Sequence, residues 1–210
     1  TGSHLPSQRH RFRNAGQVCV SPTRFYVQQN IYDAFVKGFA ARTTHVTIGS
    51  GLDAETKMGP LANARRPAAI GALVDDARAK GARVLAGGDR GDHGYFFQPT
   101  VLADVPQEAD IMSNEPFGPV AVCRPFESFD EAIEQANRLP YGLAAFAFTE
   151  NGRRANLLGD AIESGMVGIN TFAISTPDSP FGGVKESGFG SEGGPEGMES
   201  YFVTKAIHQA

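Results

Sequence analysis

The chain has 210 residues, which is enough for one or two domains with a sizeable buried core and excludes a small disulfide-stapled scaffold. Hydrophobic residues make up 41% of it and charged residues 20%, and no apolar run approaches the roughly 18 residues that a membrane span needs. The formal net charge is -4 and the 19 Lys and Arg residues are scattered, so the basic patch typical of nucleic-acid binding is missing. We therefore expect a folded, soluble protein with neither nucleic acid nor a membrane as partner.

Residues 1–11 are assigned to a leader or a cloning remnant, because residues 1–10 are polar and show no apolar period. Beyond them, short apolar runs alternate with longer amphipathic stretches. In the stretch 31–42, Ile31, Phe35 and Phe39 recur at four-residue spacing and predict one buried helix face.

The remaining elements follow the same alternation of strand and helix. The sequence predicts strands at 23–27, 83–86, 98–102, 120–125, 144–148 and 166–170, a short extended run at 45–48, and helices at 31–42, 61–80, 129–138 and 153–162. This cadence predicts an α/β fold in which a largely parallel sheet is flanked by helices on both faces.

The last forty residues depart from this pattern. Residues 171–197 are rich in glycine and proline and predict a long surface loop that carries function. Residues 201–208 alternate enough to form a last strand, and with no neighbouring strand in sequence this one is expected to pair outside its own sheet.

The two cysteines, Cys19 and Cys123, lie in very different contexts, which predicts reduced thiols and a cytoplasmic location. No signal peptide or lipidation motif is visible, and His45, His93 and His208 are too dispersed to suggest a metal site.

Cys19 lies in irregular backbone just before a predicted strand, whereas buried structural cysteines usually lie inside elements. Such a position suits a nucleophile, which needs a lowered thiol pKa and backbone N–H groups to hold an oxyanion. The alternative is an inert loop thiol. Cys123 lies in the middle of a predicted strand and is expected to be a small packed hydrophobe.

Three motifs resemble those of the aldehyde dehydrogenase family. They are residues 12–19 (FRNAGQVC), residues 115–120 (EPFGPV), and residues 180–183 (PFGG) followed by 185–188 (KESG). The resemblance covers residues 12–208 and corresponds to the C-terminal half of a family member. It implies a catalytic domain at 12–197 and an oligomerisation tail at 198–210, with the nucleotide-binding domain upstream and outside these residues.

The resemblance also implies roles for particular residues. Cys19 would attack the aldehyde carbon, Glu115 would bind the nicotinamide-side ribose of NAD or NADP, and Phe117 would pack near the nicotinamide. Phe181 would line the substrate tunnel, where an apolar wall excludes water. A carboxylate accepts two hydroxyl donors well, which fits the role of Glu115, although a plain turn at a strand start is the alternative.

The substrate class depends on finer positions. Arg13 resembles the arginine that pairs with the distal carboxylate in succinate-semialdehyde dehydrogenases, and Ser175 and Thr176 resemble a hydroxyl-bearing segment that assists it. A guanidinium grips a carboxylate bidentately and disfavours neutral aldehydes, which would leave its charge unpaired. The alternative is that Arg13 is a solvated surface charge.

Residues 188–193 match the dinucleotide-binding pattern GxGxxG but are interpreted as a flexible turn, because no strand–helix–strand unit surrounds them. The resemblance places the family's general-base glutamate and an oxyanion-binding asparagine upstream of Cys19, so this chain alone is expected to be a poor enzyme.

We therefore expect the catalytic part of an NAD(P)-dependent aldehyde dehydrogenase acting on a carboxylated semialdehyde, assembled as a homodimer or homotetramer through residues 201–208. Two alternatives stay open: a non-catalytic oligomerisation fragment, and a cofactor-free thiol esterase that uses Cys19.

Overall fold

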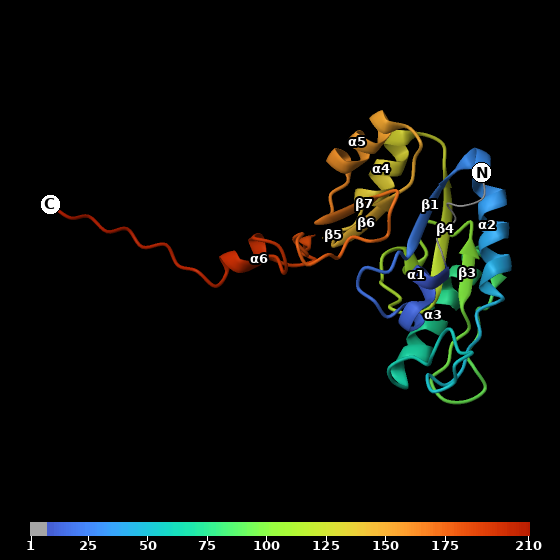
Figure 1. Ribbon diagram of the computed structural model, residues 1–210. Coiled ribbons are helices and arrows are strands. Elements are labelled where there is room, and N and C mark those ends of the chain that lie inside the picture. The colour runs from blue at the N-terminus through green and yellow to red at the C-terminus, as the bar shows by residue number, and fades with distance from the viewer. Residues whose placement is uncertain (1–7) are drawn as a thin grey trace. The chain divides into compact units, whose positions relative to one another are not determined.

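The computed structural model describes residues 8–210 (Figure 1). The chain divides into two compact units, one ending at Gln135 and the other running from Ala136 to Ala210, and each is described by itself. No helix in the described part of the chain has the length and apolar character that crossing a membrane requires.

The first unit is built on a four-stranded sheet with the order β1-β4-β3-β2. Its strands are β1 (Arg24–Gln28), β2 (Arg83–Ala86), β3 (Thr100–Ala103) and β4 (Val120–Phe126). β4 pairs in parallel with both β1 and β3, and only the edge strand β2 runs antiparallel. The predicted α/β fold with a largely parallel sheet is confirmed, and all four strands lie where the sequence predicts them to within about two residues.

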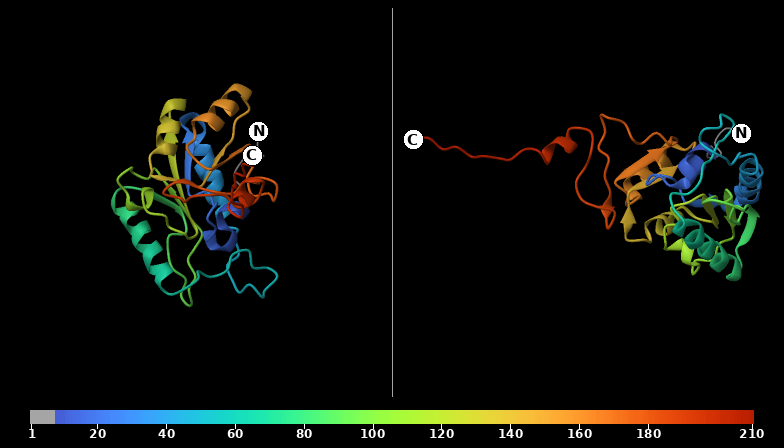
Figure 2. Two further views of the ribbon diagram at one scale, coloured as in Figure 1. Left: turned by 90° about the vertical axis from the view of Figure 1, so that its left-hand side faces the viewer. Right: turned by 90° about the horizontal axis from the view of Figure 1, so that it is seen from below.

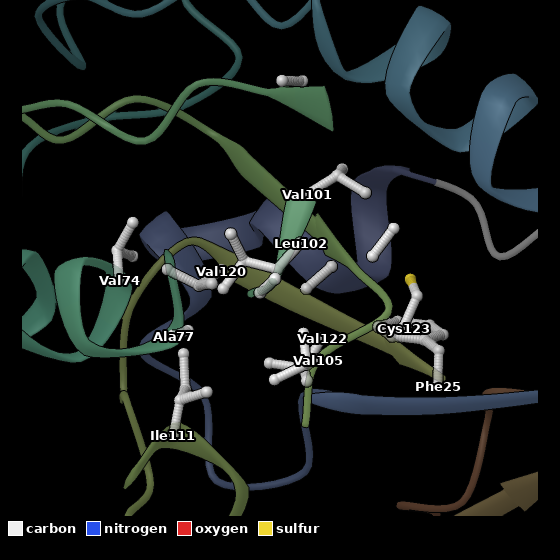
Figure 3. Close-up of a cluster of buried hydrophobic side chains, with 14 of the residues drawn as sticks. Phe25, Val74, Ala77, Val101, Leu102, Val105, Ile111, Val120, Val122 and Cys123 are labelled. Carbon is white, nitrogen blue, oxygen red and sulfur yellow. The ribbon is translucent and has the colours of Figure 1, made fainter. Parts of the chain in front are cut away.

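Two long helices cover this sheet. α2 (Gln29–Thr43) packs against all four strands, and α3 (Arg65–Ala79) lies on the opposite side (Figure 2). Neighbouring side chains of β3 point to opposite faces, as Val101 and Leu102 do in Figure 3. Both of these side chains are fully buried, so the sheet carries core on both faces.

The buried face of α2 agrees with the predicted one only in part, because Phe39 is buried and Phe35 packs against the core but Ile31 does not. Ile31 is 53% exposed, and the residues that face the core are Tyr32, Val36, Phe39 and Thr43. A row of residues four apart drifts around a helix that has 3.6 residues per turn. The row that starts at Ile31 therefore begins outside the core, packs against it at Phe35 and is fully buried at Phe39, which is 1% exposed.

Other boundaries in the first unit also differ from the prediction. α3 begins at Arg65 and not at residue 61, because residues 61–64 form a turn in which Asn63 Oδ1 accepts a hydrogen bond from the Arg65 N–H at 3.1 Å. The extended run expected at 45–48 is reduced to a single bridge between Ile48 and Met58.

The segment assigned to a leader contains ordered structure. α1 (Gln8–Phe12) is followed by the 3-10 helix η1 (Arg13–Gly16), so the prediction of a leader is wrong for residues 8–11; residues 1–7 lie outside the described part. Phe12 is 2% exposed and its ring lies 6.2 Å from that of Phe39. This contact anchors the start of the cysteine motif to α2.

The second unit contains two small sheets and one of the predicted helices, α5. β6 (Ala144–Ala147) pairs in parallel with β7 (Met166–Ile169), and α5 is Gly152–Ala161. α4 (Phe129–Asn137) runs from the first unit into the second.

The predicted loop 171–197 is not wholly irregular. It contains β8 (Val184–Lys185), which pairs with β5 (Tyr141–Gly142), a short strand that the sequence analysis missed. The four-residue helix α6 (Glu196–Glu199) begins within it. Both elements are so short that a periodicity of apolar residues cannot show them.

The tail after α6 forms no strand pairing within the described residues. Its apolar side chains are exposed, among them Tyr201 at 83%, Val203 at 94% and Ile207 at 79%. Pairing of residues 201–208 with another subunit stays a prediction, because the structure contains one chain.

Candidate active site

The loop before Cys19 is shaped by three consecutive residues in the left-handed region. Asn14, Ala15 and Gly16 have φ values of 51°, 53° and 71°. Asparagine and glycine tolerate this conformation, whereas it is strained for alanine. Hydrogen bonds hold the turn closed: Asn14 Nδ2 donates to the Gln17 carbonyl at 2.9 Å, and Gln17 Nε2 donates to the Asn14 carbonyl at 3.1 Å.

Cys19 lies in the next turn, which the Ser21 N–H closes by donating to the Val18 carbonyl at 2.9 Å. Its side chain is exposed. Within residues 8–210 no hydrogen bond occupies the backbone N–H of Cys19. The sulfur is thus accessible, and an amide is available beside it to stabilise an oxyanion.

The other cysteine has the opposite environment. Cys123 lies in β4 with 0% exposure, and burial raises the pKa of its thiol far above the ordinary value. A thiol held in its neutral form inside the core is a poor nucleophile, so the structure separates a packed cysteine from an accessible one.

The EPFGPV motif forms a rigid turn leading into β4. Pro116, Gly118 and Pro119 are buried, and the Val120 N–H donates to the Gly118 carbonyl at 2.8 Å. Glu115 is exposed, and Phe117, with a φ of 37°, is 38% exposed. The buried residues anchor the turn, which leaves the carboxylate and the ring free to meet a ligand.

The cysteine loop and this turn are in direct contact. A Cβ atom on Gly16 would collide with the Gly118 carbonyl, and one on Gly118 would collide with Ile70 of α3. Neither position has room for a side chain. The first and second motifs, about one hundred residues apart in sequence, therefore meet backbone to backbone within the first unit.

Sequence reasoning missed Arg11, which is 1% exposed. Its Nε donates to the Val120 carbonyl at 2.9 Å, its Nη1 donates to Ser21 Oγ at 2.9 Å, and its Nη2 donates to the Gly118 and Val120 carbonyls. Burial lowers the pKa of Arg11 to about 9, and the nearby charge of Glu115 partly opposes this shift. Arginine is rarely buried, so its position gave no sequence signal.

Arg13 has a different environment from Arg11. It is exposed, and in the part of the chain that the structure describes no hydrogen bond or ion pair engages its guanidinium. An unpaired guanidinium close to the cysteine loop in sequence suits the recognition of an anion, and it equally fits the alternative of a solvated surface charge.

The remaining predicted substrate residues belong to the second unit. Ser175 and Thr176 are exposed, and Thr176 Oγ1 lies 2.8 Å from Ser179 Oγ. Phe181 is half-buried and exchanges two backbone hydrogen bonds with Glu192, at 2.7 and 2.8 Å. Thr176 lines an open cavity of about 270 Å³ beside β7. Cys19, Glu115, Phe117 and Arg13 thus share one unit, and Ser175, Thr176 and Phe181 share the other.

Comparison with known proteins agrees with the three motifs. The sequence model of the aldehyde dehydrogenase family matches residues 7–207. This chain belongs to the aldehyde dehydrogenase family.

Among curated relatives, this aldehyde dehydrogenase chain is 50% identical over 200 residues to the putative 4-(hydroxymethyl)benzenesulfonate dehydrogenase of Comamonas testosteroni, covering 95% of the chain and 42% of the relative. It is 43% identical to the NADP(+) succinate-semialdehyde dehydrogenase of Escherichia coli strain K12, with coverages of 93% and 41%. The crystal structure of succinate-semialdehyde dehydrogenase from Burkholderia pseudomallei superimposes with a TM-score of 0.89 at 40% identity, covering 91% of this chain and 40% of that one. The chain spans about two-fifths of the length of these relatives.

Proposed function

We propose that the protein to which this chain belongs oxidises an aldehyde to the acid through a covalent intermediate on Cys19, with NAD or NADP as the oxidant. The observation that carries the proposal is the accessible Cys19 thiol, which has an unengaged backbone amide beside it and lies in a loop packed against the Glu115 turn. Family membership supports the same chemistry.

The chemistry follows from these groups. The Cys19 thiolate attacks the carbonyl carbon, a C–S bond forms, and the carbonyl electron pair moves to oxygen. The Cys19 N–H donates to the resulting oxyanion of the thiohemiacetal. Loss of hydride from the same carbon restores the carbonyl as a thioester, and water then cleaves the C–S bond to release the carboxylate and the thiolate, with two protons passing to solvent.

The first unit has residues that fit a nicotinamide dinucleotide. The exposed Glu115 carboxylate can accept hydrogen bonds from ribose hydroxyls, and the Phe117 ring offers an apolar surface beside it. When bound, the cofactor supplies the hydride acceptor. The rigid turn from Pro116 to Pro119 keeps both groups in place for this contact.

The proposed substrate is an aldehyde that carries an anionic group, with Arg13 as the recognition residue and Ser175 and Thr176 as additional donors. A succinate-type semialdehyde is the first candidate, supported by the E. coli relative. The 50% identity to the putative 4-(hydroxymethyl)benzenesulfonate dehydrogenase favours a second candidate, an aromatic aldehyde with a sulfonate group, which is what oxidation of that hydroxymethyl group would give. A guanidinium can bind either a carboxylate or a sulfonate through two parallel hydrogen bonds.

A homodimer or homotetramer joined through residues 201–208 is also proposed. Its support is a row of exposed apolar side chains, Tyr201, Phe202, Val203 and Ile207, on a segment without a strand partner within the described residues.

The test is a comparison of Cys19→Ser with Cys123→Ser in the full-length enzyme. We expect Cys19→Ser to lower kcat by a factor on the order of 10³ or more, because the nucleophile is lost, and Cys123→Ser to stay within about tenfold of the parent. Aldehyde oxidation that survives Cys19→Ser would contradict the proposal. Cofactor-independent hydrolysis of an activated ester, with no oxidation, would favour the thiol esterase alternative.

A further inference from the structure

Arg11 is a buried charge that the proposed function does not use. A cation removed from water is costly unless its donors are hydrogen-bonded, so a guanidinium at 1% exposure requires an explanation. The acceptors around it are one hydroxyl and two backbone carbonyls, and no carboxylate of residues 8–210 is in hydrogen-bond contact with it. Arg11 is therefore bound to backbone and loop groups and forms no conventional salt bridge.

These acceptors belong to two different loops. On one side, Ser21 Oγ accepts from Arg11 Nη1 at 2.9 Å, and the Ser21 N–H closes the turn that carries Cys19. On the other side, Arg11 Nη2 donates to the Gly118 carbonyl, in the turn that carries Glu115. The planar guanidinium donates to both loops, and its Nε donates to the Val120 carbonyl at the start of β4.

We propose that Arg11 is a positioning residue that fixes the Cys19 turn relative to the Glu115 turn. The role rests on the proposed function, in which Cys19 holds the reacting carbon and Glu115 helps to hold the hydride acceptor. Reacting groups must be placed to within about 0.5 Å, and a displacement of about 1 Å can cost on the order of 100-fold in rate.

The geometry requires arginine and not merely a positive charge. The guanidinium carries five N–H donors in a rigid fork, whereas a lysine ammonium is a single point at the end of a flexible stem. Lysine at position 11 can reach one loop and leave the other without its donor. Methionine fills a similar volume and removes the donors to both loops.

The experiment compares Arg11→Lys, Arg11→Met and Ser21→Ala in the full-length enzyme. The matched control is Arg124→Met, because Arg124 Nη1 also donates to a backbone carbonyl, that of Val105 at 2.9 Å, but touches neither loop. We expect Arg11→Met to lower kcat by about 10- to 100-fold with KM for the aldehyde changed less than about threefold. Arg11→Lys should be intermediate, and Arg124→Met should keep the parent kcat.

Amide hydrogen exchange gives a second readout that does not depend on activity. The amides of Ser21 and Val120 close the two turns, so both should exchange faster in Arg11→Met, by at least about tenfold. In Ser21→Ala, only the amide of residue 21 should exchange faster. Ser21→Ala keeps the buried guanidinium, and it decides the question if Arg11→Met does not fold.

The outcomes separate this proposal from the proposed function. Two outcomes would overturn the positioning role. One is an Arg11→Met variant that is less stable to heat but has the kcat of the parent and its amide exchange rates at both turns. The other is a Ser21→Ala variant with the kcat of the parent and its amide exchange rate at residue 21. An enzyme that oxidises no aldehyde but shows the expected exchange pattern would refute the proposed function and leave the link between the loops standing.

Discussion

At the scale of single residues, the candidate site depends on its glycines as much as on its larger side chains. Gly16 has a φ of 71°, and the space where its Cβ would lie is filled by the Gly118 carbonyl. This close approach lets the Cys19 loop and the Glu115 turn pack backbone to backbone. The cysteine motif thus needs glycine at this position for two separate reasons.

The variant Gly16→Ala separates these two reasons when it is compared with Gly81→Ala. Gly81 also has a positive φ, of 107°, but nothing lies within 4 Å of its Cβ position. We expect Gly81→Ala to lower the free energy of unfolding by about 1–2 kcal/mol through backbone strain alone. Gly16→Ala should lower it by about 2–4 kcal/mol, because overpacking adds to the strain. Equal losses in urea denaturation would show that the contact with Gly118 is unimportant.

Arg13 provides a test of substrate class in the full-length enzyme. We expect Arg13→Gln to raise KM for succinate semialdehyde by about 10- to 100-fold, because a hydrogen bond to a charged group contributes roughly 1.5–3 kcal/mol. Propanal, which has no anionic group, should be affected less than about twofold. Steady-state kinetics with both aldehydes measures the difference, and equal effects on the two would favour the alternative of a solvated surface charge.

At the scale of elements, apolar periodicity predicts the sheet and the long helices well, because the strands are buried in the core and each long helix buries one face against it. It does not locate a helix face to within one residue, as the exposure of Ile31 on α2 shows. It also cannot predict β5 and β8, which are two residues each and are held by backbone pairing. Arg11 was missed for a related reason: its burial depends on carbonyls far away in sequence.

The different burial of Phe39 and Ile31 on α2 gives a stability prediction. Phe39 is 1% exposed and packs against the rings of Phe12, Phe25 and Phe35, whereas Ile31 on the same helix is 53% exposed. We expect Phe39→Ala to lower the free energy of unfolding by about 3–5 kcal/mol and Ile31→Ala to change it by less than about 0.5 kcal/mol. Chemical denaturation of both variants measures this, and a large effect at Ile31 would show that Ile31 also contributes to the core.

At the scale of the whole molecule, the tail after α6 lies outside the packed core. Residues 203–210 have no regular structure and are exposed along their length, yet they include apolar side chains that water disfavours. Three motifs from distant parts of the sequence identify the family without any of these contacts being known. The motifs do not show which backbone carbonyls surround a side chain such as that of Arg11, and only the structure shows these contacts.

The proposed oligomer can be tested in the full-length enzyme with two proline variants of the tail. Proline removes a backbone N–H, so Ala206→Pro should weaken strand pairing with a second subunit, whereas Gln209→Pro lies beyond the predicted strand and serves as the control. Light scattering coupled to gel filtration should show a smaller assembly for Ala206→Pro only. An unchanged mass for both would argue against assembly through residues 201–208.

The most direct test of covalent catalysis at Cys19 is a mass-spectrometric search for the acyl intermediate. The full-length enzyme, quenched in acid during turnover with an aldehyde and NAD or NADP, is digested and its cysteine peptides are weighed. We predict an acyl group on the peptide that contains Cys19, absent from the Cys123 peptide and absent in Cys19→Ser. Turnover that leaves Cys19 unmodified while another residue carries the acyl group would contradict the central claim.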